Sequence, residues 1–131
     1  MSDLRDKLGS KKTVGAFVSC LMFSRNQAHV FHLQNDNYAK HIALGDYYGG
    51  IVDLIDSLVE TYQGTNPVIM DYMNSEKYTG YTKEGVTKYF EGLLKETVEA
   101  RSLFTDSDLL NIVDEIISLI KSTLYKLKRL A

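Results

Sequence analysis

Apolar residues recur at helical spacing along four stretches of this 131-residue chain, and one long segment between them lacks that period. That segment, 64–82, holds the only proline, Pro67, among Gly, Asn and Ser residues. Connections of this length usually hold some structure of their own, and 68–73 has the pattern of a short helix. The sequence therefore predicts four helices and one long connection. The four helical stretches are 13–33, 38–63, 83–101 and 105–127.

The two remaining connections are short. Asn35, Asp36 and Asn37 break the first helix and can cap the second, and Gly64 suits its C-cap. The segment 105–108, Thr-Asp-Ser-Asp, resembles a capping box at the start of the fourth helix. Two short-loop hairpins joined by one long crossover form the ferritin-like kind of four-helix bundle. We predict an all-α single domain over 1–131, with 1–12 as a polar N-terminal tail and 64–82 as the crossover.

Each predicted helix carries one apolar stripe that should face the core. The stripes are Val14, Phe17, Leu21, Ala28 and Phe31; Leu44, Tyr48, Ile51, Ile55, Leu58 and Tyr62; Val86, Phe90, Leu93 and Thr97; and Leu109, Ile112, Ile116, Ile120, Leu124 and Leu127.

Composition excludes several classes of protein. The chain is 44% hydrophobic and 24% charged, which is typical of a globular domain and unlike a disordered one. No apolar run approaches the ~18 residues that a membrane helix needs. The polar N-terminus lacks a signal core, so we expect a cytoplasmic protein without a membrane partner. The single cysteine, Cys20, cannot form an internal disulfide, and its apolar neighbours predict a buried, inert thiol.

All three histidines lie in the segment AHVFHLQNDNYAKH, 28–41. On a helical wheel, His41 shares one face of the second helix with Gly45, Gly49, Asp56 and Glu60. Imidazole with carboxylate suits iron, zinc or manganese. His41 lies about 22 Å along the axis from Asp56, so one helix cannot bring them to one ion. An antiparallel second copy of the helix could bring His41 of one chain to Asp56 and Glu60 of the other. The glycines on the same face suit the close approach of two copies at a two-fold interface.

The Ala-His pair at 28–29, a second His twelve positions later and the Asp-x-x-x-Glu pair in DLIDSLVETYQG resemble the mini-ferritins called Dps-like (DNA-protection-during-starvation) proteins. The matching segment spans 14–64, and the remainder matches only in helical plan. In that family, two histidines of one subunit face the acidic pair of its two-fold mate at a ferroxidase site. The resemblance therefore implies an iron site formed by His29, His41, Asp56 and Glu60, in a two-fold dimer or a dodecameric shell.

Two positions differ from the family pattern. Gly45 stands where an acid usually follows the second histidine, and Val30 replaces a usual tryptophan. His32, otherwise interpreted as a helix-end bystander, is the additional ligand that could replace the missing acid. In length, the chain is most similar to short Dps-like proteins encoded by bacteriophages.

Three functions follow as alternatives. The first is iron binding between subunits, with oxidation of Fe(II) by peroxide or oxygen. The second is a non-catalytic ferritin-like oligomer, of phage origin, that uses Gly45 and Gly49 as interface residues. The third is sequence-independent DNA binding through repeated basic termini, although the formal net charge of -2 gives the whole chain no attraction for nucleic acid. Whether the protein is an enzyme depends on the first alternative.

Overall fold

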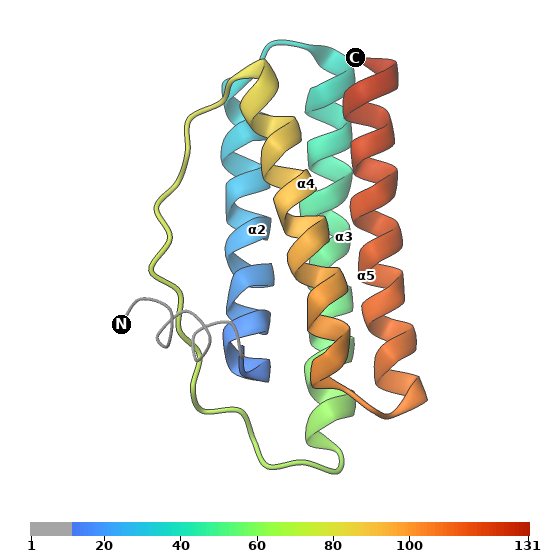
Figure 1. The fold of residues 1–131 in the computed structure, drawn as a ribbon. Helices are drawn as coiled ribbons and strands as arrows, with labels where there is room; N and C mark the ends of the chain where they lie inside the picture. Colours follow the sequence, from blue (N-terminus) through green and yellow to red (C-terminus); the bar gives the residue numbers. More distant parts are fainter. Residues whose placement is uncertain (1–11) are drawn as a thin grey trace, which may run out of the picture.

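The computed structural model describes residues 12–131, and four α-helices account for most of them (Figure 1). The predicted all-helical architecture with four helices is confirmed, and the described residues contain no strand. All of the predicted tail except Lys12 lies outside the described residues. The elements are α2 (Val14–Gln34), α3 (Tyr38–Gln63), α4 (Lys83–Ala100), the 3₁₀ turn η1 (Arg101–Leu103), α5 (Ser107–Tyr125) and the π-helical turn η2 (Lys126–Leu130).

Short turns join α2 to α3 and α4 to α5, and the segment 64–82 links the two hairpins along the length of the bundle (Figure 1). α3 packs against both α2 and α5, and α4 packs against α5 and, less extensively, against α2. None of the described helices has the length and hydrophobicity to cross a membrane.

Side-chain caps fix three of the four helix starts. Thr13, Asn37 and Thr82 each accept a hydrogen bond from the backbone N–H three residues later. The predicted capping box before α5 is wrong: Asp106 occupies the N-cap position without a side-chain hydrogen bond. The carboxylate of Asp108 accepts instead from the neighbouring N–H of Leu109, at 2.8 Å.

The predicted stripes form the core. Most of their members are buried, whereas Val14, Tyr48, Tyr62 and Ile112 pack partly buried against it. The largest fully buried side chain is Tyr47, next to the predicted stripe. Its hydroxyl lies 2.7 Å from Ser24 Oγ, and its ring meets Phe90 edge-on. The hydrogen bond lets α3 bury a phenol against α2 without leaving the hydroxyl unsatisfied.

The crossover contains no helix, so the short helix predicted over 68–73 is wrong. This segment is extended and runs beside α2 (Figure 1). Side chains of α2 bind its backbone: Ser19 accepts from Met73, and Gln27 both accepts from and donates to Thr79. Gln34 accepts from Tyr81 N–H at 2.8 Å. These bonds satisfy an extended backbone that would otherwise need a helix or a sheet.

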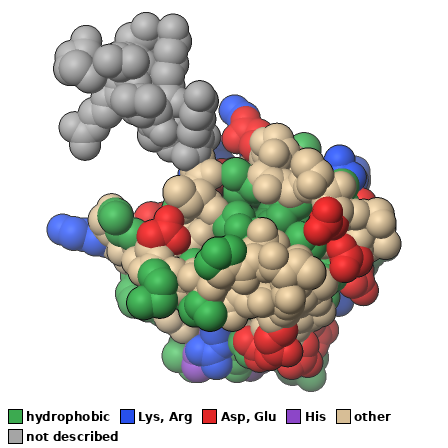
Figure 2. Space-filling view, turned by 90° about the horizontal axis from the view of Figure 1, so that it is seen from below, with side chains coloured by type: hydrophobic (Ala, Val, Ile, Leu, Met, Phe, Trp, Pro, Cys, Tyr) green, Lys and Arg blue, Asp and Glu red, His purple; other side chains and the backbone are tan. Residues whose placement is uncertain are grey.

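Apolar side chains are exposed along the same crossover. From the end of the bundle at which the crossover leaves α3, hydrophobic side chains lie on the surface among acidic ones (Figure 2). The exposed large apolar residues of the crossover are Val68, Met70, Tyr72, Met73 and Tyr78.

Candidate functional site

The α2–α3 corner brings the histidines together. His32 lies in the last turn of α2 and His41 in the first turns of α3, and their rings stack with centroids 3.6 Å apart. His32 Nδ1 lies 2.6 Å from the carbonyl oxygen of His41, and His41 Nδ1 lies 2.9 Å from that of His32. Each ring therefore forms a hydrogen bond with the backbone of the other helix, and we call this pair of bonds the His32–His41 clamp.

These two hydrogen bonds fix which ring nitrogens are available. A carbonyl oxygen can only accept, so each Nδ1 must carry and donate its proton. In the neutral imidazole, the lone pair is then on Nε2, which makes no hydrogen bond within the described residues. An Nδ1–H donated to a backbone carbonyl is the arrangement that orients histidine as a metal ligand through its other nitrogen.

His29 completes the cluster one turn earlier on α2. Its ring stacks on Tyr48 of α3 with centroids 4.3 Å apart, and its centroid lies 6.1 Å from that of His32. His32 thus contacts both of the predicted ligands and is the centre of the cluster. Tyr48, predicted as a core residue, thus packs against His29. The Arg25 guanidinium lies 5.9 Å from the centroid of the Tyr48 ring.

The His32 ring leaves little room for a side chain at Gly45. A Cβ added at this glycine would lie 3.2 Å from His32 Cε1 and 3.4 Å from its Nδ1, closer than most such contacts. The close approach predicted here comes from the same chain. A Cβ at Gly49, by contrast, would have no neighbour within 4 Å, so only Gly49 has open space on this face.

The acidic pair lies far from the histidines. Asp56 and Glu60 are exposed on α3, about four to five turns beyond His41. Neither forms an ion pair with another described residue. Among residues 12–131, no three His, Cys, Asp or Glu side chains are grouped closely enough to hold a metal ion. One chain therefore supplies two separate halves of the predicted site.

A family model described as "Family of unknown function (DUF5856)" matches residues 32–127, more than half of the chain. The chain belongs to the DUF5856 family. No curated protein and no solved structure matches it significantly. The range of this DUF5856 protein that the family model matches begins at His32 and includes His41, Asp56 and Glu60. His29 precedes it.

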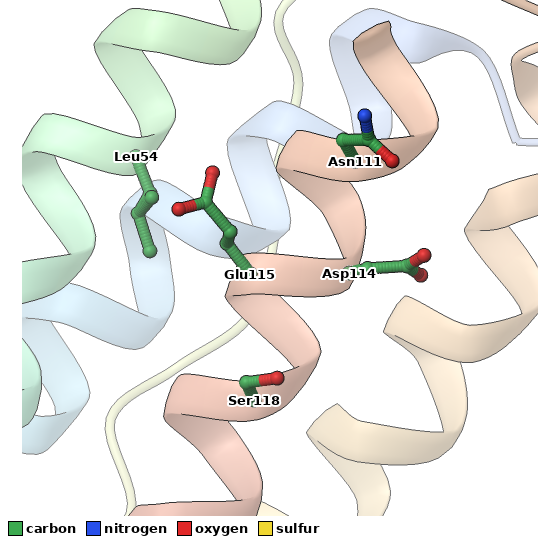
Figure 3. Close-up of a pocket in the computed structure, with 5 residues that line it drawn as sticks. All are labelled: Leu54, Asn111, Asp114, Glu115 and Ser118. Carbon is green, nitrogen blue, oxygen red and sulfur yellow. The ribbon is translucent and has the colours of Figure 1, made fainter. Parts of the chain in front are cut away.

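A hollow of the DUF5856 chain lies between α3 and α5. It measures about 370 Å³ and is lined by Leu54, Asn111, Asp114, Glu115 and Ser118. Glu115 points toward Leu54, whereas Asp114 points to the other side of α5 (Figure 3). Asp114 is paired with Arg101 at 2.8 Å, so this groove offers only one unpaired carboxylate and no converging set of ligands.

The predicted burial of the single cysteine is confirmed. Cys20 is buried, and its Sγ lies 3.3 Å from Glu96 Oε2. Burial raises the pKa of this thiol to about 12, and the Glu96 carboxylate acts in the same direction. Because the thiolate is the reactive form, this raised pKa disfavours a nucleophilic role for Cys20 at neutral pH.

Sequence reasoning missed several buried polar residues, of which Lys40 and Gln27 are the largest. Lys40 is only 5% exposed, and its Nζ donates to the Tyr81 hydroxyl at 3.1 Å. Gln27 is fully buried where it holds the crossover. Gln27 lies one turn before Phe31, and a polar residue next to an apolar stripe was the available signal for it.

Proposed function

We propose that this DUF5856 protein is a Dps-like, ferritin-like homo-oligomer that binds iron between two copies of the chain. The histidine cluster of one copy and the Asp56/Glu60 pair of the other would form each site. The observation that carries this proposal is the reciprocal clamp of His32 and His41, which leaves two oriented Nε2 atoms without a partner at one end of an exposed helix face.

The spacing along α3 supports an antiparallel pairing of two copies. The point midway between His41 and the acidic pair falls at Gly49 and Gly50. A two-fold axis at Gly49 would place His41 of each copy opposite the acids of the other. Gly49 is exposed, with open space where a side chain would be, so a second helix can approach there.

Exposed apolar residues flank the histidine corner on the same hairpin, and a second copy would cover them. They are Leu33, Tyr38 and Ile42, exposed by 69%, 77% and 42%.

Iron bound at this site would be the substrate of oxidation by peroxide or oxygen. The chain's part is to orient two imidazole lone pairs through Nδ1–H bonds and to supply carboxylate oxygens from the facing copy. Zinc and manganese accept the same ligand types, so metal identity is the first quantity to measure.

Mixing two inactive variants tests the shared site. We expect the His32→Ala/His41→Ala protein and the Asp56→Asn/Glu60→Gln protein each to lose metal uptake. A dimer of one variant with the other contains one intact site instead of two. If all chains pair in this way after equal mixing, the metal bound per chain should recover to about half of the native value. Metal per chain and native mass are measured together, and Glu115→Gln on α5 is the control that should bind normally.

Failure of the mixture to recover metal binding, while mixed oligomers form, would rule out the shared site. Retention of full uptake by the two carboxylate substitutions would do the same.

A non-catalytic oligomer is the second candidate, and the exposed apolar residues of the corner and the crossover favour it. It predicts that both ligand-deficient variants assemble normally, whereas Gly49→Leu dissociates the oligomer. DNA binding has less support, because Lys126 and Lys128 near the C-terminus pair with Asp46 and Glu91.

A further inference from the structure

A cavity of about 410 Å³ lies at the end of the bundle where α3 and α4 begin and α5 ends. Three lysines and one glutamate line it. Lys128 is paired with Glu91 at 2.9 Å, so Lys40 and Lys83 are the two lining lysines without an ion pair among the described residues. Its lining residues are Lys40, Lys83, Glu84, Thr87, Leu127, Lys128 and Ala131.

Lys40 is the unusual member of this set. Lysine is almost never fully buried unless it is paired, yet Lys40 is 5% exposed. Its described contacts are the Tyr81 hydroxyl at 3.1 Å and the Tyr81 ring, whose centroid lies 5.7 Å from Nζ. Both contacts are with a neutral group. No described carboxylate forms an ion pair with Lys40, so the ammonium is buried beside the cavity without a counter-charge.

The surrounding backbone adds positive potential. Lys83 is the first residue of α4, and Lys40 lies in the first turn of α3, so both helices direct their N-terminal ends toward this region. The Thr82 hydroxyl accepts from the Gly85 N–H and its carbonyl accepts from the Val86 N–H, which leaves the N–H groups of Lys83 and Glu84 for a ligand. The π-helical turn η2 supplies Leu127 and Lys128 to the opposite wall.

We infer that this cavity binds a phosphate-sized anion, either inorganic phosphate or the phosphate group of a small organic monoester. The anion would lie between Lys40 and Lys83 and provide the missing counter-charge. Thr87 offers a hydroxyl donor, and Glu84 opposes the anion and limits its affinity. This site shares no residue with the proposed metal site, although Lys40 directly precedes His41 on α3.

Titration calorimetry with inorganic phosphate tests the inference, with chloride at equal ionic strength as the blank. We expect saturable binding that weakens at least tenfold in Lys40→Met and in Lys83→Gln. Lys88→Gln is the matched control, because Lys88 is exposed on α4 and lines a different cavity. Glu84→Gln should bind phosphate more tightly than the native chain, a gain that damage to the fold would not produce.

A second titration with glycerol phosphate distinguishes the two sources. Tighter binding of the monoester assigns the remaining volume to an organic group, and equal binding assigns the site to free phosphate. Absence of saturable phosphate binding would overturn the inference. So would equal losses in the Lys88→Gln control, or a Glu84→Gln protein whose affinity is unchanged.

Discussion

Replacing Gly45 by alanine separates two explanations for a glycine within α3. A methyl group in a helix interior normally stabilises by about 1 kcal/mol relative to glycine. At Gly45 the same methyl would lie 3.2 Å from His32 Cε1, so the ring must shift by a few tenths of an ångström. That ring is held by its hydrogen bond to the His41 carbonyl and by its stack on His41.

The expected cost follows from those two contacts. Weakening the hydrogen bond costs about 0.5–1.5 kcal/mol, and loosening the stack costs a similar amount at most. The helix gain at Gly45 should therefore be cancelled or reversed. Gly92→Ala in the interior of α4, where an added Cβ meets nothing within 4 Å and no interface is proposed, should keep the full gain. We expect the Gly45 variant to be less stable than the Gly92 variant by about 1–2 kcal/mol.

Urea unfolding followed by circular dichroism measures this difference, at one fixed protein concentration because association shifts apparent stability. The same pair of variants is then made with His32→Ala. If the His32 ring is the obstacle, the difference should fall to the additivity error of about 0.5 kcal/mol. A difference that persists without the ring would place the obstacle elsewhere, such as on a second copy. Equal stabilisation by both alanines in the native background would refute the packing itself.

Two further results are expected. Gln27→Leu should lower the free energy of unfolding by about 1–3 kcal/mol, because the Thr79 N–H and carbonyl lose their partners. Hydrogen exchange of the Thr79 amide should become faster. The control Asn26→Ala, at an exposed position, should change neither the free energy of unfolding nor this exchange rate. Cys20 should resist alkylation near neutral pH until urea unfolds the chain, and stability should fall as the pH rises from 9 toward 12. The unfolded thiol ionises near pH 9 and the buried one near 12, so urea midpoints across this range should drop less in Cys20→Ala.

Local signals were sufficient to predict the helices. The stripe and cap over Tyr38–Gln63 gave α3 its observed bounds, because period, Asn37 and Gly64 all indicate the same segment. The capping box failed for a local reason: a carboxylate in Thr-Asp-Ser-Asp can bond its neighbour's N–H rather than the third one along. Short polar residues offer several such bonds, and the pattern does not choose among them.

The crossover could not be predicted in the same way. Its extended form depends on Ser19 and Gln27, which lie more than fifty positions away from their partners Met73 and Thr79. The apolar spacing of 68–73 favours a helix only if nothing else satisfies its backbone. Ser19 on α2 accepts from the Met73 N–H, and Gln63 at the end of α3 accepts from the Ile69 N–H. The bond from Ser19 is a tertiary effect that outweighs local propensity.

The histidine segment was predicted as a corner, but the role of His32 was not. Its reciprocal bond with His41 depends on how tightly the turn folds back, which residue spacing does not specify. The acidic pair is a different case. Because α3 is a continuous helix, its length keeps Asp56 and Glu60 away from His41 in any fold of a single chain.

That separation gives the proposed site a thermodynamic signature. If one metal ion is held by two copies, the factor by which metal tightens their association must equal the factor by which association tightens metal binding. The His32–His41 clamp is formed within one chain, so little ordering of the histidines remains to oppose either step. In the mixing experiment, the amount of bound metal and the amount of the mixed oligomer should therefore rise together. A site within one chain would fill without any change in mass, and a purely structural interface would change mass without filling.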